Sequence, residues 1–143
     1  MQVKIKRLVS NAVIPQYARP GDAGLDLVAT NITYNEQDNF IKYHTGIAME
    51  IPEGYVGLVY PRSSLSKKHS YLCNHVGVID SGYRGEITVC FRNTIADPDY
   101  RPYIIGDRIA QIIIVPYPKI QFIEVNNLSS TQRGDGGYGS TGN

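Results

Sequence analysis

The chain contains many short segments in which hydrophobic and polar residues alternate. The alternation is clearest in residues 3–8 and 87–92, and in the second segment Ile87, Val89 and Phe91 share the apolar face. A period of two is typical of a β-strand with one buried face. The same pattern predicts further short strands at Leu25–Ala29, Ile47–Ile51, Tyr55–Tyr60 and Ile120–Val125.

A longer segment, Arg108–Val115, is apolar nearly throughout and rich in β-branched residues. With the stop at Pro116, this composition predicts a strand buried on both faces. Strand-breaking residues recur about every ten positions, which predicts an all-β fold: a sandwich, a jelly roll or a barrel. A helix of one or two turns is expected only near Ser63–His69, with Ser63 or Ser64 as its N-cap.

The C-terminal end has a different composition. The last eleven residues, Arg133–Asn143, contain five glycines and no aliphatic residue. Such a segment cannot form a core of its own and is expected to be mobile in the free protein. We therefore divide the chain into a β-strand domain at residues 1–126, the jelly roll of the resemblance given below, and a glycine-rich arm at residues 127–143.

Composition and charge narrow the class of ligand. The 143 residues, of which 42% are hydrophobic and 19% charged, suit a single folded domain. The formal net charge is +1, so the chain lacks the basic field with which proteins bind nucleic acids. An anionic ligand would have to be small and held by a local cluster.

The location of the protein is also an expectation from composition. No segment resembles a signal peptide, and no eighteen consecutive residues are apolar, so neither export nor a membrane-spanning helix is expected. The two cysteines, Cys73 and Cys90, are too few for a disulfide framework or a metal knuckle, and we expect them to be small buried residues. These features predict a cytoplasmic protein.

Two segments carry groups suited to binding phosphate. Arg62, Ser63 and Ser64 follow a predicted strand and begin the predicted helix, so that charge, hydroxyls and free backbone N–H groups meet there. In the arm, glycines and the guanidinium of Arg133 could approach an anion closely, beside the ring of Tyr138 and the hydroxyls of Ser140 and Thr141. A capped surface turn and a flexible chain end are the simpler explanations of the two segments when each is taken alone.

Asp80 is the candidate for acid–base chemistry. It follows Val78-Ile79 and precedes a turn built on Gly82 and Gly85. If apolar groups enclose its carboxylate, the anion is disfavoured and the group becomes a better general base. The alternative is an aspartate that caps a hairpin turn, and Tyr83 could equally be a ring packed across two strands.

Gln111 and Asp26 are two further polar residues in apolar surroundings. Gln111 interrupts the apolar segment 108–115 and must be hydrogen-bonded there. It could pair with the backbone, or it could hold a phosphate oxygen or a water molecule. Asp26 could be a turn residue, or it could contact the water shell of a metal ion without binding the ion directly.

Five segments, taken in order, resemble the five motifs of the homotrimeric dUTPase family. Each motif is weak evidence alone, but the order of all five from about residue 15 to the end is specific. The five segments are Ala23–Asp26, Pro61–Ser64, Gly77–Glu86, Gly106–Gln111 and Arg133–Gly142.

The resemblance implies a jelly-roll homotrimer with three active sites shared between subunits. In this family the first, second and fourth motifs come from one subunit, the third from a neighbour and the fifth from the arm of the remaining subunit. The implied reaction is hydrolysis of dUTP to dUMP and pyrophosphate, by attack of water on the α-phosphate. The implied cofactor is Mg²⁺, held mainly by the substrate triphosphate, with Asp26 acting only through the water shell of the ion.

The resemblance also implies roles for individual residues. Asp80 would be the general base and would bind the 3′-OH, and Tyr83 would stack under the deoxyribose, leaving no room for a 2′-OH. The edge of uracil would be read by Asn74 and by the backbone of Gly77, Val78, Ile79, Asp80 and Thr88. The phosphates or the attacking water would be held by Arg62, Ser63, Ser64 and Gln111. The arm would close over the nucleotide with Arg133, Tyr138, Gly139, Ser140 and Thr141.

The sequence departs from the family pattern at Tyr138, where the family usually has Phe, and the loop Asp97–Pro102 has no assigned role. Two alternatives remain open: a dUTPase-like regulator that senses the nucleotide, and a relative of dCTP deaminase. A dCTP deaminase relative would lack the arginine- and glycine-containing arm that this chain has. A purely structural jelly roll would explain none of the five segments.

Overall fold

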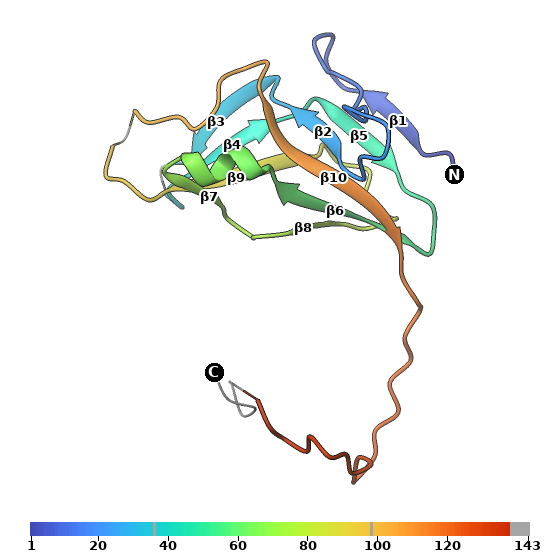
Figure 1. The fold of residues 1–143 in the computed structure, drawn as a ribbon. Helices are drawn as coiled ribbons and strands as arrows, with labels where there is room; N and C mark the ends of the chain where they lie inside the picture. Colours follow the sequence, from blue (N-terminus) through green and yellow to red (C-terminus); the bar gives the residue numbers. More distant parts are fainter. Residues whose placement is uncertain (36, 98, 138–143) are drawn as a thin grey trace.

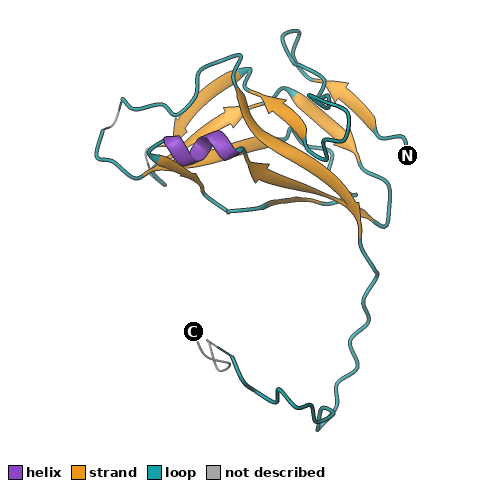
Figure 2. Ribbon diagram, viewed as in Figure 1, coloured by secondary structure: helices purple, strands orange, loops and turns teal. Residues whose placement is uncertain are grey.

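The alternating segments form antiparallel strands in a computed structural model that describes residues 1–35, 37–97 and 99–137 (Figure 1). The first five strands are β1 (Lys4–Arg7), β2 (Leu25–Val28), β3 (Asn31–Asn35), β4 (Phe40–His44) and β5 (Ile47–Glu50). The others are β6 (Tyr55–Pro61), β7 (Ser70–Leu72), β8 (Gly77–Ile79), β9 (Thr88–Asn93) and β10 (Arg108–Pro116). A single 3₁₀ helix, η1 (Ser63–Lys67), appears among the described residues, and Figure 2 shows it at the end of β6.

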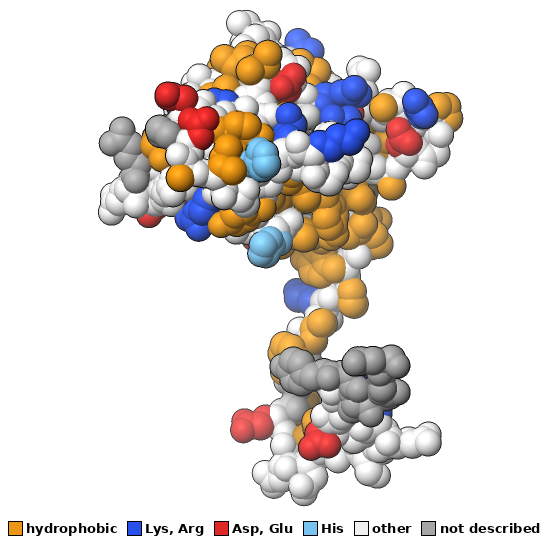
Figure 3. All heavy atoms as spheres, turned by 60° about the vertical axis from the view of Figure 1, so that its left-hand side comes forward, with side chains coloured by type: hydrophobic (Ala, Val, Ile, Leu, Met, Phe, Trp, Pro, Cys, Tyr) orange, Lys and Arg blue, Asp and Glu red, His pale blue; other side chains and the backbone are white. Residues whose placement is uncertain are grey.

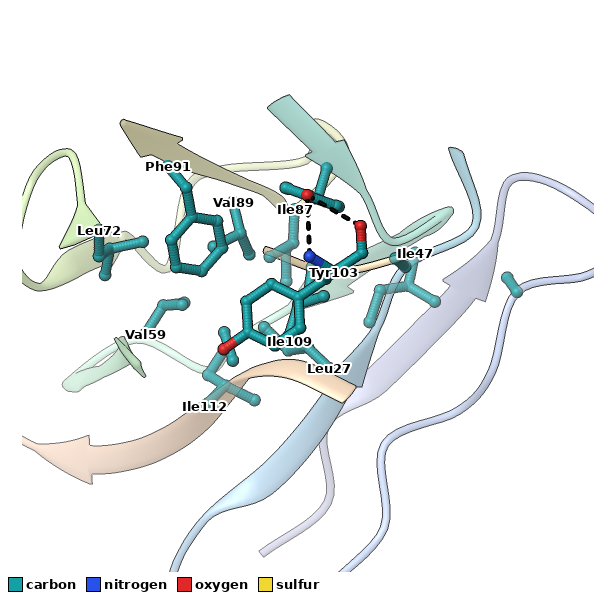
Figure 4. Close-up of a cluster of buried hydrophobic side chains, with 14 of the residues drawn as sticks. Leu27, Ile47, Val59, Leu72, Ile87, Val89, Phe91, Tyr103, Ile109 and Ile112 are labelled. Carbon is teal, nitrogen blue, oxygen red and sulfur yellow. Dashed lines mark hydrogen bonds between the residues drawn. The ribbon is translucent and has the colours of Figure 1, made fainter. Parts of the chain in front are cut away.

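Two four-stranded sheets pack face to face and enclose the core. One has the order β2-β10-β6-β8 and the other β3-β4-β9-β7, while β1 and β5 form a separate pair. The core lies between the two sheets, where Leu27, Ile109 and Ile112 of the first face Val89 and Phe91 of the second (Figure 4). The prediction of an all-β, jelly-roll-like fold is therefore confirmed, in the form of a sandwich of open sheets.

Strand β10 is the centre of the first sheet, as its composition predicts. It pairs with β2 on one side and β6 on the other. Ile109 and Ala110 are consecutive and both fully buried in the core, at a point where the register of β10 with β2 shifts. From Ile113 onward the strand is only half-buried.

Three expectations from the sequence are wrong. Residues 120–125 are not a strand and have no regular structure, because no other strand of the described chain lies beside them and a lone strand is not stable. The residue before η1 is Arg62, and no side chain caps the helix, so neither Ser63 nor Ser64 is its N-cap. Cys73 and Cys90 are half-buried free thiols rather than fully buried ones.

The chain leaves the sandwich after β10 and runs away from it (Figure 1). Five apolar side chains in this segment are between 54% and 91% exposed. They are Ile120, Phe122, Ile123, Val125 and Leu128. Figure 3 shows hydrophobic side chains over the lower side of the body and into the first part of this segment. No helix in residues 1–35, 37–97 and 99–137 is long and apolar enough to cross a membrane.

Tyr43 ties the loop before β10 to the core. Its hydroxyl donates to the carbonyl oxygen of Tyr103 at 3.1 Å and accepts from the N–H of Tyr103 at 3.3 Å, as the dashed lines in Figure 4 show. Burial raises the pKa of Tyr43 to about 12, so the hydroxyl stays protonated at neutral pH.

A Tyr43→Phe variant should therefore be less stable by about 2–4 kcal/mol, because two buried backbone groups lose their partner. The free energy of unfolding in urea, measured at one protein concentration, checks this value. A Tyr34→Phe variant is the control, since the Tyr34 hydroxyl bonds at the surface to Asn39. Equal stability of the two variants would contradict the role of Tyr43.

Candidate active site

Three charged side chains meet where β2, β6 and β10 lie side by side. The Asp26 carboxylate binds Arg62 Nε at 2.9 Å through one oxygen and an Arg108 guanidinium nitrogen at 3.2 Å through the other. The Asp26 side chain is only 17% exposed, so water screens these contacts less than it would at the surface. Asp26 therefore holds two guanidinium groups in place, and their remaining N–H groups can bind an anion.

Gln111 lies within the same group of residues. Its partners in the sheet are Asp26 on β2 and Tyr60 on β6, and its side-chain amide donates to the Pro61 carbonyl at 3.3 Å. The side-chain oxygen reaches so close to Gly24 that a Cβ at that position would clash with it. A side chain at position 24 would therefore displace the Gln111 amide, which lies between the first and second motifs.

Ser63 and Ser64 begin η1 directly beside Arg62. Ser63 is exposed and Ser64 half-buried. An open cavity of about 420 Å³ is lined by Arg62 and Ser63, with further lining from Pro61, Leu65, Ser66, Lys68 and Ser70. The first, second and fourth motifs thus form one continuous surface that carries positive charge, hydroxyls and an amide.

The third motif lies elsewhere on the molecule. Gly77, Val78 and Ile79 form β8, which pairs only with β6 and is an edge of its sheet. Asn74 is exposed in the turn before β8 and lies close to Gly77. Thr88 begins β9 in the other sheet, opposite His44.

Asp80 and Tyr83 are both exposed in the turn after β8. The Tyr83 N–H donates to the Asp80 carbonyl at 3.0 Å and closes this turn. Apolar groups around the Asp80 carboxylate would make it a better base, but within its own chain Asp80 is exposed. Any enclosure of this carboxylate has to come from a ligand or from another subunit.

The two groups of residues are too far apart to act together within one chain. Asp80 follows the pair Gly57–Ile79, whereas Gln111 pairs with Tyr60 near the other end of β6. Standard strand geometry puts them about 13 Å apart along the strands and about 10 Å apart across them. A general base and a water-binding amide that share one water molecule must lie within roughly 6 Å of each other.

The arm is described only up to residue 137. Arg133 Nε donates to the Gly136 carbonyl at 3.0 Å, in a turn where Gly134 has a φ of +56°. The other predicted arm residues, Tyr138, Gly139, Ser140 and Thr141, lie outside the described residues. Arg133 is exposed and has no contact with the sandwich that the structure records.

Two residues of the charged group have no role that the sequence alone predicts. Arg108, in the fourth motif, shares Asp26 with Arg62. Gly24, in the first motif, leaves room for the Gln111 side chain. Their roles depend on strand pairing rather than on local sequence, because the register of β10 with β2 and β6 brings together positions 24, 26, 62, 108 and 111.

Comparison with known proteins identifies the family. A family model described as dUTPase matches residues 10–142. The chain belongs to the dUTPase family. Deoxyuridine 5'-triphosphate nucleotidohydrolase from Thermobifida fusca is 42% identical over 144 residues, which cover 99% of this chain and 79% of the relative. The protein of the same name from Corynebacterium glutamicum is 46% identical over 143 residues, covering 98% of this chain and 94% of the relative.

A solved dUTPase confirms the fold of this family member. The dUTPase of Staphylococcus bacteriophage 80alpha, solved with dUPNHPP, superposes with a TM-score of 0.82 at 29% identity. The match covers 99% of this chain and 98% of the phage protein. The dUTPase match thus spans all five segments from which the sequence analysis drew its resemblance.

Proposed function

We propose that this dUTPase-family chain hydrolyses dUTP to dUMP and pyrophosphate. The observation that carries the proposal is the group formed by Asp26, Arg62, Arg108 and Gln111. It places two oriented guanidinium groups and one amide on a single surface, and such groups position and neutralise a triphosphate. The hydroxyls of Ser63 and Ser64 add donors at the start of η1.

Uracil recognition fits the edge strand β8. An edge strand has backbone N–H and C=O groups that no neighbouring strand uses. Those of Gly77, Val78 and Ile79 offer donors and an acceptor in a fixed order, together with the Asn74 side chain and the backbone of Thr88. Such a template leaves the amino group of cytosine without an acceptor, which disfavours dCTP.

The chemical step needs a base and an ordered water molecule. Asp80 takes a proton from the water that attacks the α-phosphorus, and Gln111 holds the same water or a phosphate oxygen. Tyr83 packs under the deoxyribose and excludes a 2′-OH. Attack on a polyanion of this kind requires positioning and charge neutralisation rather than a covalent intermediate.

A homotrimer with shared sites accounts for the separation of Asp80 from Gln111. If a neighbour supplies the third motif, Asp80 of one subunit can reach the Gln111 group of another. The exposed apolar side chains of residues 120–128 support association, since a contiguous apolar segment in water indicates an interface. The arm of a further subunit then closes over the triphosphate with Arg133, Tyr138, Gly139, Ser140 and Thr141.

The proposed metal ion is Mg²⁺ bound to the triphosphate. The described part of the chain has no group of three His, Cys, Asp or Glu side chains that could chelate an ion. This suits Mg²⁺, which commonly binds through substrate phosphates and water rather than in a protein cage. When bound, the ion neutralises phosphate charge. We assign Asp26 to the water shell of the ion, since both of its carboxylate oxygens already bind arginines.

The decisive assay measures pyrophosphate released from dUTP, UTP, dTTP and dCTP under the same conditions. We expect kcat/KM for dUTP to exceed that for each of the other nucleotides by at least about 10²-fold. The amino group of cytosine would find no acceptor in the template, the methyl group of thymine would clash with it, and Tyr83 would exclude the 2′-OH of UTP. Equal rates with all four nucleotides would refute the proposal. Release of ammonia from dCTP would point instead to the deaminase alternative, which the dUTPase relatives do not favour.

A further inference from the structure

Glu86 makes contacts in two directions, one through its side chain and one through its backbone. We propose that Glu86 is a positioning residue that fixes the Tyr83 ring and so sets the preference for deoxyribose over ribose. The inference rests on the proposed function, in which Tyr83 packs under the sugar. None of the roles described above involves Glu86 or its partner His44.

The Glu86 side chain is anchored at the corner between β4 and β5. One carboxylate oxygen accepts from the Gly46 N–H at 2.8 Å, and the other lies 2.8 Å from His44 Nδ1. The Glu86 and His44 side chains are only 27% and 24% exposed. The other ring nitrogen of His44 lies 3.1 Å from the Thr33 hydroxyl, so both sides of the histidine ring are held.

The corner that receives Glu86 is itself rigid. Gly46 is buried and has a φ of +65°, which other residues rarely adopt. The buried Thr45 hydroxyl donates to the Ile87 carbonyl, and the Ile87 N–H donates to the Ile47 carbonyl. The position of the Glu86 backbone is therefore fixed by the hydrogen bonds of the Glu86 side chain and by those of the Ile87 backbone.

The Glu86 backbone in turn holds Tyr83. The Tyr83 hydroxyl donates to the Glu86 carbonyl oxygen at 2.9 Å. The ring lies so close to Gly85 that a Cβ at position 85 would clash with the hydroxyl and the ring carbons. The Tyr83 ring thus packs against Gly85, and its hydroxyl binds the Glu86 carbonyl, whose position the Glu86 side chain determines.

This arrangement has a functional consequence because Tyr83 is otherwise exposed. A tyrosine side chain at the surface can rotate about its first side-chain torsion, and in other rotamers the ring would leave the sugar-binding face. The contact with the Glu86 carbonyl selects one rotamer before substrate arrives, so that the ring blocks a 2′-OH without first having to be ordered.

The test compares dUTP with UTP in the full-length enzyme. Glu86→Ala removes both side-chain anchors and should lower the ratio of kcat/KM for dUTP to that for UTP by about tenfold. His44→Ala removes one anchor and should have a smaller effect in the same direction. Glu86→Gln should restore most of the preference, because its amide can accept from Gly46 and donate to the His44 tautomer that is protonated on Nε2.

The exposed Asp38, in the turn between β3 and β4, provides the matched control. Asp38→Asn removes the same charge away from the Tyr83 turn and should keep the wild-type ratio. If Glu86→Ala lowers kcat/KM equally for dUTP and UTP, Glu86 is merely structural and the inference is wrong. An unchanged ratio of kcat/KM for dUTP to that for UTP in Glu86→Ala also overturns the inference. If Glu86→Ala does not fold, a wild-type ratio in His44→Ala overturns it instead. Failure of the proposed function is distinguishable, because then the wild-type enzyme would show no preference for dUTP.

Discussion

An Asp80→Asn variant is expected to bind dUTP but to hydrolyse it about 10²–10⁴-fold more slowly than the wild-type enzyme, the usual contribution of a general base. The amide keeps the size and one oxygen acceptor of the carboxylate, so contacts with the deoxyribose 3′-OH can remain. It cannot take a proton from water. The fall should therefore appear in kcat, while the affinity for a non-hydrolysable dUTP analogue changes little.

Asp80 lends itself to this test because it is exposed within its own chain. Substituting an exposed turn residue does not disturb the packing of the core, so stability should stay within about 0.5 kcal/mol of wild type. Asp99→Asn, at another exposed aspartate, serves as the control for loss of one charge. Full activity of Asp80→Asn would show that another group is the base, and loss of nucleotide binding would show that Asp80 acts mainly in recognition.

The fold could be predicted where local pattern and tertiary environment agree. Ile87, Val89 and Phe91 alternate with polar residues and are all buried, and the apolar composition of residues 108–115 correctly predicts the central strand β10. The strand β3 could not be predicted in this way. Its sequence Asn-Ile-Thr-Tyr-Asn has only one strongly apolar aliphatic residue, and it becomes a strand through pairing with β4 at the edge of the sheet.

Residues 120–125 show the opposite failure. Their apolar residues have the composition of a strand, but a strand needs a partner for its backbone. Within one chain this segment lies outside the sandwich, with Phe122 91% exposed. The composition indicates that the segment is suited to burial. It does not indicate whether the surface that covers the segment belongs to the same chain or to another subunit.

The candidate site was predictable as a set of motifs but not as a set of contacts. Asp26, Arg62 and Arg108 are separated by tens of residues, and only the order β2-β10-β6 brings them together. The sequence leaves Asp26 open as a turn residue or as a group in the water shell of a metal ion, and the structure adds that its carboxylate lies between two arginines. The side-chain anchors of Glu86 lie about 40 residues away and leave no local pattern.

The loop Asp97–Pro102, for which the sequence offers no role, makes specific contacts at Tyr100. The Tyr100 hydroxyl accepts from the His69 N–H at 3.2 Å, and its carbonyl oxygen accepts from the Asn93 side chain at 3.0 Å. The loop thus packs against the segment that follows η1. The contact with His69 joins residues 31 positions apart, which explains why the sequence near residue 100 does not predict it.

Two inactive variants should recover activity when their subunits are mixed. Asp80→Asn lacks the base, and Gln111→Ala lacks the amide that holds the water. If each site takes Asp80 from one subunit and Gln111 from another, unfolding and refolding an equal mixture should give about a quarter of wild-type activity, because one site in four then combines two intact residues.

The converse mixture provides an independent measurement. A double variant, Asp80→Asn with Gln111→Ala, is refolded together with an equal amount of wild-type chain. Random assembly then leaves both residues intact at one site in four, whereas sites built within one chain would stay intact at one in two. The activity of the wild-type chain should therefore fall by about half. Refolding wild-type chain alone gives the reference for losses in handling. If both residues instead act within one chain, the first mixture stays inactive and the second keeps the wild-type contribution. The strand register argues for exchange, since the rigid sheet holds Asp80 and Gln111 of one chain at opposite ends of β6.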